Sequence, residues 1–325
     1  MALTPIDNTH ALQIQAGTLG RKAGHIFEDS IAKTINECIF PIHLSESNLK
    51  HVLVGDPSIL LLRYIAADLH IKIIQSATAI STGSLATSEE GKKWLSVNGV
   101  SLSRCKSDLV ITLTDTNDKK FTVGVSSKQC NNKNPTNAQL YFTTARGFSS
   151  LLQSNGIPVS STAVDALRQF CGDSGFRPLD NLEQYPNRRV DPRRCFWEEI
   201  NPTGRAEWED LFSRKQDEIS YLLFQKAYMN DPFIPEYLIH KTKFSINWEQ
   251  TEVAIYSIKE LVDLSAKYNS FSTEEYSVKK GSYKDPEGIK HLAPRFGIIQ
   301  MQRGGQQQHP DQLQFNLKAG YFYKI

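Results

Sequence analysis

Two apolar runs joined by a short polar stretch predict a β-hairpin in the first half of the chain. The runs cover residues 107–113 and 121–128. Residues 115–118 between them are Asp-Thr-Asn-Asp, and Asn and Asp tolerate the backbone angles of a tight turn. Asp108 opens the first run and Lys128 closes the second, so an acid and a lysine should lie on adjacent strands at one edge of a sheet.

Helical periodicity predicts several helices. Near the start of the chain, Phe27, Ile31 and Ile35 repeat at four-residue spacing, which is typical of a helix with one buried stripe. Residues 57–68 form a second predicted helix, with a proline in its first turn and Asp56 as its N-terminal cap. Further helices are predicted at residues 136–154, 207–229 and 251–268.

The rest of the pattern completes an α/β protein. Residues 1 to about 105 are expected to be a largely helical lead-in, and residues 270–294 a polar loop. Two strands, at residues 295–303 and 312–317, are expected to close the chain around a turn at Gly304 and Gly305.

A polar, proline-containing stretch at residues 171–202 suggests how the chain is divided. It separates residues 1–170, with the helical lead-in and the hairpin, from residues 171–325, with helical and β elements. A chain of 325 residues is also compatible with one large domain, so both divisions stay open.

The predicted pairing of Asp108 with Lys128 suits metal-assisted chemistry on a phosphodiester. A hard cation such as Mg2+ prefers carboxylate and carbonyl oxygens and keeps several waters. It lowers the pKa of a bound water, and a nearby ammonium can stabilise charge that develops on the phosphate. Side chains two apart on a strand share a face, so Ser126 and Lys128 should both point toward Asp108. The alternative is that Asp108 is an ordinary loop aspartate and Lys128 an ordinary solvated lysine at the end of a strand.

The arrangement of Asp108, the hairpin and Ser126-Ser127-Lys128 resembles the PD-(D/E)xK nuclease superfamily, and within it the type II restriction endonucleases. Two positions depart from the family pattern: Ser107 replaces its proline, and Ser126 replaces its second acid. The resemblance implies a restriction-endonuclease-like core, a central mixed β-sheet flanked by helices, here with additional helical and C-terminal β elements. It also implies that Asp108 binds Mg2+, that Lys128 positions or activates the water, and that the Ser127 carbonyl is a further ligand.

Glu28 is the candidate for the missing acid. It lies beside the apolar stripe of the first predicted helix, and the opening helix of many restriction enzymes carries a glutamate that faces the metal. The resemblance therefore makes Glu28 a catalytic and metal-binding candidate. The alternative is that Glu28 and Asp29 only occupy the first turn of a helix, where the helix dipole favours acids.

Two polar clusters are candidates for contacts with DNA. Gln302, Arg303 and Gln306 surround the predicted C-terminal turn, and Arg and Gln can pair bidentately with guanine and adenine. Arg188 and Arg189 belong to a short arginine-rich stretch that could clamp phosphates. The alternative for the C-terminal turn is an ordinary solvated hairpin. The alternative for the arginine-rich stretch is a loop of solvated arginines.

Composition narrows the class of protein. The hydrophobic fraction of 40% and the charged fraction of 22% suit a water-soluble globular protein, and the net charge of +2 argues against a non-specific nucleic-acid binder. The five cysteines form no CxxC pair, which argues against structural zinc and disulfides and favours a reducing compartment. Without a signal-peptide pattern or a long apolar span, we expect no membrane association and a cytoplasmic location if the source is bacterial.

These observations lead to one functional hypothesis with two alternatives. The hypothesis is a type II site-specific deoxyribonuclease that uses Mg2+ to hydrolyse phosphodiester bonds in double-stranded DNA. Such an enzyme is expected to be a homodimer, because a palindromic site calls for two-fold symmetry, and to be paired with a cognate DNA methyltransferase. The alternatives are a repair or junction-resolving nuclease of the same fold, and a DNA-binding protein with a decayed, non-catalytic nuclease core.

Overall fold

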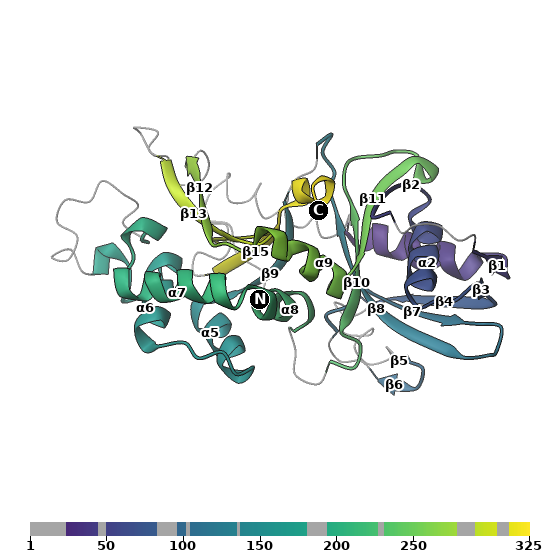
Figure 1. The fold of residues 1–325 in the computed structure, drawn as a ribbon, viewed down its shortest axis with the longest axis horizontal. Helices are drawn as coiled ribbons and strands as arrows, with labels where there is room; N and C mark the ends of the chain where they lie inside the picture. Colours follow the sequence, from purple (N-terminus) through teal and green to yellow (C-terminus); the bar gives the residue numbers. More distant parts are fainter. Residues whose placement is uncertain are drawn as a thin grey trace, which may run out of the picture. The chain divides into compact units, whose positions relative to one another are not determined.

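The computed structural model divides the chain into two compact units, which are described separately. The described residues are 24–44, 50–82, 96–101, 105–134, 137–180, 194–226, 231–277, 290–303 and 312–325. The mixed-sheet unit comprises residues 16–138, 224–264 and 319–325. The antiparallel-sheet unit comprises residues 1–15, 139–223 and 265–318. Each unit is discontinuous in sequence, as the colours of Figure 1 show.

A six-stranded sheet forms the centre of the mixed-sheet unit. Its strands lie in the order β2 (Val52–Gly55), β11 (Thr251–Ser257), β10 (Pro235–Lys241), β8 (Lys120–Gln129), β7 (Leu109–Thr114) and β4 (Ser76–Ser81). Strands β8 and β10 are parallel, and the other neighbours are antiparallel. Two short antiparallel pairs accompany this sheet: β1 (Ile42–His43) with β3 (Ile73–Ile74), and β5 (Ser96–Val97) with β6 (Val100–Ser101). Because β10 and β11 come from beyond residue 171, the later part of the chain completes this sheet.

Two helices pack on one face of the six-stranded sheet. The first covers residues 24–37, and Phe27, Ile31 and Ile35 are buried on it as the periodicity predicted. The second is α2 (Pro57–Asp68), and the side chain of Asp56 caps it by accepting from Ser58 N at 2.7 Å. Both helices share one hydrophobic core with β7, β8, β10 and β11. Burial of this shared apolar stripe is what fixes the helices to the sheet.

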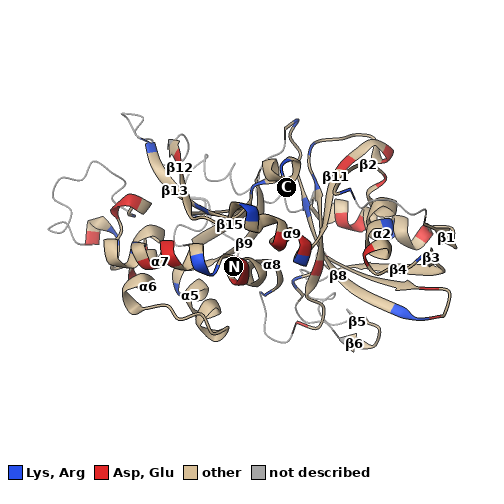
Figure 2. Cartoon of the chain, in the orientation of Figure 1, with Lys and Arg blue, Asp and Glu red and all other residues tan. Residues whose placement is uncertain are grey.

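The predicted hairpin is confirmed. Strands β7 and β8 pair in antiparallel register, from Leu109 opposite Val125 to Thr114 opposite Lys120. The Asp115 carboxylate accepts from two backbone amides in the turn, those of Asn117 at 2.8 Å and Lys119 at 2.9 Å. Figure 2 shows charged residues gathered at this turn. The turn therefore sets the register that brings the start of β7 beside the end of β8.

A five-stranded sheet forms the centre of the antiparallel-sheet unit. Its order is β12 (Ser272–Ser277), β13 (Lys290–Phe296), β14 (Ile299–Arg303), β15 (Gln312–Leu317) and β9 (Ala138–Thr144). The unit also contains the helices α5 (Ala145–Ser154), α6 (Ser161–Cys171), α7 (Pro202–Arg214) and most of α8 (Gln216–Gln225). Stacked aromatic rings fill its interior, including Phe148 on Trp208 and Phe212 on Phe296.

The chain also contains short helical pieces. Helix α9 (Ile258–Ser265) follows β11 directly. The 3-10 helices are η1 (Pro178–Asp180), η3 (Trp197–Glu199), η4 (Trp248–Gln250), η5 (Ala266–Tyr268) and η6 (Ala319–Tyr323). None of the helices in the described ranges has the length and apolar character needed to cross a bilayer.

The α/β class with a mixed sheet flanked by helices is confirmed, whereas several predicted elements are wrong. Residues 138–144 and 251–257 form strands where helices were predicted, and only the residues after them are helical. In both segments β-branched and aromatic residues are frequent, and burial in a sheet outweighs the weak helical spacing. The predicted helix at 207–229 is two helices that meet at Lys215. The expected loop at 270–294 contains β12 and the start of β13, and the lead-in before residue 105 contains six short strands.

Candidate active site

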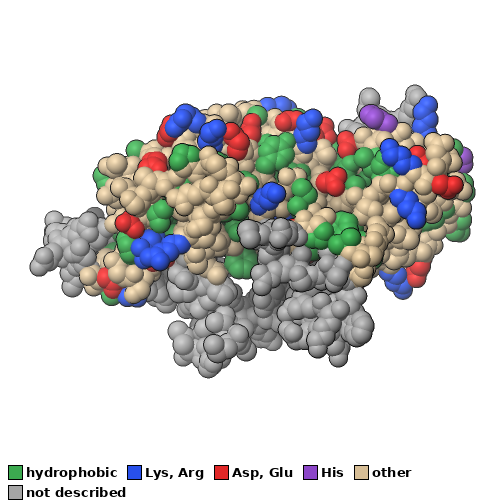
Figure 3. All heavy atoms as spheres, turned by 90° about the horizontal axis from the view of Figure 1, so that it is seen from below, with side chains coloured by type: hydrophobic (Ala, Val, Ile, Leu, Met, Phe, Trp, Pro, Cys, Tyr) green, Lys and Arg blue, Asp and Glu red, His purple; other side chains and the backbone are tan. Residues whose placement is uncertain are grey.

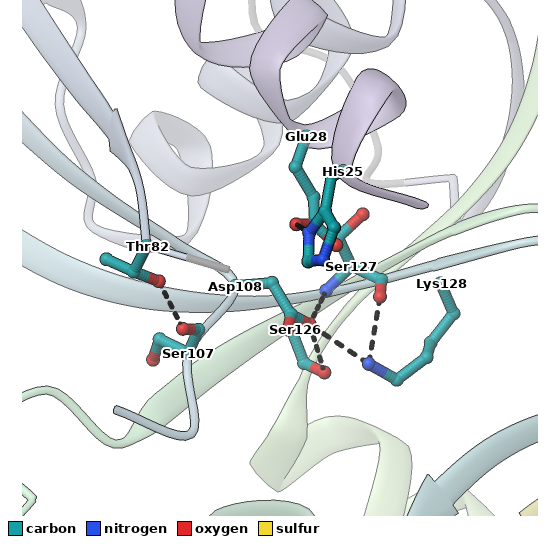
Figure 4. Close-up of polar contacts among 8 residues, drawn as sticks. All are labelled: His25, Glu28, Thr82, Ser107, Asp108, Ser126, Ser127 and Lys128. Atoms are coloured by element: carbon teal, nitrogen blue, oxygen red, sulfur yellow. Dashed lines mark hydrogen bonds and ion pairs between the residues drawn. The ribbon is translucent and has the colours of Figure 1, made fainter. Parts of the chain in front are cut away.

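The start of β7 and the end of β8 bring four polar groups together. Asp108 lies opposite Ser126 across the hairpin, one step beyond the pair of Leu109 and Val125. The Oδ2 atom of Asp108 accepts hydrogen bonds from Ser126 Oγ at 3.2 Å, Ser127 N at 2.7 Å and Lys128 Nζ at 2.9 Å. The geometry predicted for Asp108, Ser126 and Lys128 is therefore present (Figure 4).

Lys128 bridges two oxygens that were predicted to bind the metal. Besides Asp108 Oδ2, its ammonium donates to the carbonyl oxygen of Ser127 at 2.8 Å. The lysine side chain is about four-fifths shielded from solvent, at 20% exposure, so this ion pair is stronger than a fully solvated one. In this arrangement the ammonium occupies the place that a cation would take between the two oxygens.

The segment before Asp108 is held firmly by its neighbours. Ser107 Oγ donates to the carbonyl of Phe233 at 2.6 Å, and Thr82 Oγ1 donates to the carbonyl of Ser107 at 2.5 Å. Gly124 permits this close approach: a Cβ there would lie 2.2 Å from Ser107 Oγ and 2.4 Å from the carbonyl oxygen of Ile234. The serine at position 107 thus anchors the strand start in a way that a proline, with no side-chain donor, could not.

Glu28 reaches the same place from the helix at 24–37. Its side chain is buried, at 6% exposure, and Figure 4 shows it directed with His25 toward Asp108 and Ser127. His25 Nδ1 lies 3.3 Å from Glu28 Oε2. Burial, and then the negative charge of Asp108, raise the pKa of Glu28 to about 9. Two carboxyl groups are therefore held together at an energetic disadvantage that a bound cation would relieve.

Sequence reasoning missed two titratable groups beside this cluster. Burial, and then the charge of Lys128, lower the pKa of Lys106 to about 8. The same two causes lower the pKa of His240 to about 3. His240 is fully buried, and neither ring nitrogen has a hydrogen-bond partner among the residues that the structure describes. It lies in register with Lys128 across the parallel strands β8 and β10. No local pattern in the sequence predicts this pairing.

The donor set fits a magnesium ion better than a structural metal. Within the described ranges, no group of three or more His, Cys, Asp or Glu side chains gathers into a metal site. Asp108 Oδ1 and Glu28 Oε1 have no hydrogen-bond partner among the described residues, which leaves one oxygen on each carboxyl group for a cation. Magnesium commonly uses one or two carboxylates and completes its shell with water and substrate phosphate.

Of the residues predicted to contact DNA, two lie in the antiparallel-sheet unit and three lie outside the described residues. Gln302 lies on β14, where its amide donates to Gln314 Oε1 at 3.2 Å. Arg303 is 8% exposed, and its guanidinium donates to Tyr276 Oη at 3.0 Å and lies over the ring of Phe196 at 4.4 Å. Base contacts by these two residues stay a prediction. Arg188, Arg189 and Gln306 lie outside the described residues.

Comparisons with known proteins give a distant structural likeness. No protein-family model matches the chain, and no curated protein matches it. Among solved structures, the fold is similar to that of the restriction endonuclease MspI in complex with its cognate DNA. The TM-score is 0.41 and the identity 12%, over 78% of this chain and 75% of that chain. A TM-score of this size describes partial overlap of two folds and assigns no activity to this chain.

Proposed function

We propose that the protein is a type II site-specific deoxyribonuclease that hydrolyses phosphodiester bonds of double-stranded DNA with Mg2+. The observation that carries this proposal is the convergence of Glu28, Asp108 and Lys128 at one edge of the mixed sheet. Two carboxyl groups in one place, one of them buried, are unfavourable for stability alone, as the raised pKa of Glu28 shows, and the charge of Lys128 opposes this shift without cancelling it. Perturbed titratable groups that gather in this way are typical of functional sites.

Each residue of the site has a proposed role. Asp108, Glu28 and the carbonyl of Ser127 would hold the Mg2+. The ion would lower the pKa of a coordinated water and neutralise charge on the phosphate. Lys128 would leave its present oxygen partners and stabilise negative charge on the scissile phosphate, or orient the water that attacks it. Ser126, with no carboxylate of its own, keeps Asp108 in position through its hydroxyl.

Further parts of the proposal concern the partners. Gln302, Gln306, Arg188 and Arg189 would contact DNA, and Arg303 would do so if its guanidinium leaves Tyr276 and Phe196. A palindromic recognition sequence would require a two-fold homodimer, since the symmetry of the protein must match that of the DNA. A cognate DNA methyltransferase would protect the host DNA from such an enzyme.

Incubation of the purified protein with plasmid and phage DNA in Mg2+ tests the proposal. We expect discrete fragments from the wild type, and a loss of cleavage of about 1000-fold or more in Asp108→Asn. Asp118→Asn is a matched control: it makes the same change on the turn of the same hairpin, at a residue with a positive φ that Asn also adopts. It should cleave like the wild type.

Other outcomes would replace the proposal with one of its alternatives. Smeared or nicked DNA that disappears in Asp108→Asn would point to a repair or junction-resolving nuclease with the same centre. DNA binding without cleavage, and without any Mn2+ binding in a calorimetric titration, would point to a decayed nuclease core. The serine at position 126, where the resembled family has an acid, is the feature that keeps this last alternative in the test.

A further inference from the structure

The loop at residues 242–250, between β10 and β11, extends past the edge of the sheet that carries the candidate site. Strand β10 runs parallel to β8, with His240 beside Lys128 and Lys241 beside Gln129. The segments that follow β8 and β10 continue side by side beyond the strands. Cys130 N donates to the carbonyl of Lys241, and Phe244 N donates to the carbonyl of Asn132, both at 2.8 Å. At about 3.3 Å per residue, Phe244 lies about 13 Å beyond the level of His240.

Polar contacts hold this loop in a defined conformation. Lys241 Nζ donates to the carbonyl of Ser245 at 3.3 Å, and Ser245 Oγ donates to the carbonyl of Asn247 at 2.8 Å. The side chain of Asn247 caps η4 by accepting from Glu249 N at 3.0 Å. The ring of Trp248 meets that of Phe27 edge-on, with centroids 5.7 Å apart, and so attaches the loop to the helix that carries Glu28.

The same contacts leave two apolar side chains of the loop in solvent. Phe244 is 55% exposed and Ile246 is 91% exposed. Single exposed apolar residues are ordinary on a protein surface, and Figure 3 shows hydrophobic side chains scattered among polar ones on one face of the molecule. Here, however, two large ones stand close together on a loop in which Ser245 and Asn247 are hydrogen-bonded within the protein. Apolar side chains gain free energy when a partner removes them from water.

The surrounding charges indicate which partner fits. The ammonium of Lys241 lies 5.8 Å from the centroid of the Phe244 ring, and Lys133 is exposed in the segment that pairs with the loop. Lys243 also belongs to the loop, paired with Glu252 at 2.8 Å. Apolar side chains bordered by lysines match a duplex in which a base step has partly unstacked, so that base faces become accessible between the two rows of phosphates. Proteins that bend DNA insert Phe, Ile and Leu between base steps in this way.

We infer that the 242–250 loop enters a groove of the DNA beside the scissile phosphate, with Phe244 and Ile246 packed against bases and Lys133 and Lys241 facing phosphates. The inference rests on the proposed function, because DNA has to approach this edge of the sheet to reach Asp108 and Lys128. It adds a second contact region, distinct from the residues that hold the metal. Phe244 contributes a ring that can stack on any base, so the loop grips the duplex without reading its sequence.

Binding of plasmid DNA in EDTA, where no cleavage occurs, tests this inference across a series of salt concentrations. The double variant Phe244→Ser/Ile246→Ser should bind about tenfold more weakly than the wild type, as expected when stacking is lost. Its salt dependence should stay unchanged, because the variant removes apolar contacts and leaves phosphate contacts in place. Ile39→Ser is the matched control: Ile39 is also 91% exposed, but follows the far end of the helix that carries Glu28, about 16 Å from it along the axis.

The outcomes separate the inference from the proposed function. Equal binding by the wild type and the double variant would overturn the inference and leave the nuclease proposal standing. Absence of DNA binding by the wild type would overturn the inference, and absence of both binding and cleavage in Mg2+ would overturn the proposed function as well. Sedimentation of both proteins without DNA completes the test: a dimer that the double variant loses would make the loop an interface between two copies of this chain and overturn the inference. Unchanged urea unfolding would show that the variant is folded, as expected for exposed residues.

Discussion

Two groups of buried titratable side chains, one in each unit of the protein, differ in how their charges are satisfied. In the antiparallel-sheet unit, the guanidinium of Arg303 donates to the hydroxyl of Tyr276 and lies over an aromatic ring, and His291 lies 2.8 Å from Glu198. In the mixed-sheet unit, burial and the charge of Asp108 raise the pKa of Glu28 to about 9, and the buried ring of His240 has no hydrogen-bond partner within the described part of the chain. Evolved proteins keep such unfavourable groups mainly where function requires them. The contrast therefore supports the proposal that the functional site lies in the mixed-sheet unit, and substitutions in both units can test it.

A large effect on stability is expected in the antiparallel-sheet unit. Replacing Arg303 with alanine removes its contacts with Tyr276 and Phe196 and leaves a cavity, so we expect the free energy of unfolding to fall by about 3 kcal/mol. Urea denaturation measures this change. Arg214→Ala is the matched control, since Arg214 is exposed on α7 and pairs with Asp210 on the surface. Its stability should stay close to that of the wild type, because an exposed ion pair contributes little.

The Arg303→Ala experiment also separates two roles for this residue. If Arg303 reads bases, the variant would keep its stability and lose affinity for DNA. Measured stability like that of the wild type would therefore contradict the structural role, and the contrast between the two units would have to be abandoned.

The next effect concerns the pH dependence of stability in the mixed-sheet unit. The pKa of Glu28 is raised from 4.5 to about 9, so between these pH values the folded protein keeps a proton that the unfolded chain releases. In EDTA, stability should therefore fall as pH rises through this window, by up to about 1.4 kcal/mol per pH unit relative to Glu28→Gln. Below the window the two proteins should differ by a constant amount.

Urea denaturation at several pH values between about 5 and 8 measures this difference. The control is Glu37→Gln, because Glu37 lies exposed at the other end of the same helix. Parallel pH profiles for the wild type and Glu28→Gln would show that Glu28 is not held protonated, and would remove the main sign of an unfavourable cluster.

A smaller effect is expected for the affinity of the site for metal. Lys128 donates to Asp108 Oδ2 and to the Ser127 carbonyl, the oxygens proposed as ligands. Lys128→Met removes a competing positive charge, so it should bind Mn2+ about tenfold more tightly than the wild type while losing cleavage activity. Calorimetric titration without DNA measures the affinity, and Lys133→Met, at an exposed lysine of the following segment, is the control. Weaker Mn2+ binding by Lys128→Met would show that the lysine supports the metal site instead of competing with the ion.

The parts of the fold that were predicted correctly depend on residues close together in sequence. The hairpin of β7 and β8 follows from alternating apolar residues and an Asx-rich turn, and its register places Asp108 beside Lys128. The helix that carries Glu28 follows from a four-residue apolar repeat, and α2 from its cap and proline. For the same reason the candidate metal site could be predicted to a large extent, since two of its residues lie on one hairpin.

The errors arose where a segment's structure depends on distant partners. Residues 138–144 and 251–257 carry weak helical spacing, yet they are strands because other strands satisfy their backbone groups and bury their side chains. The sequence made Arg303 a candidate for base contacts because it adjoins a polar turn. In the structure its guanidinium packs on the ring of Phe196. Local patterns do not contain this information.

The sequence by itself determined the α/β class, the hairpin and the pairing of Asp108 with Lys128, because short-range periodicity and turn chemistry decide these features. Only the tertiary structure decided that β10 lies parallel to β8, and this pairing puts His240 beside Lys128 and the 242–250 loop beyond the site. It also decided that Glu28 is buried against Asp108, which raises its pKa. Desolvation and charge proximity act through space, so they are fixed when distant segments pack together and not by the order of residues in the chain.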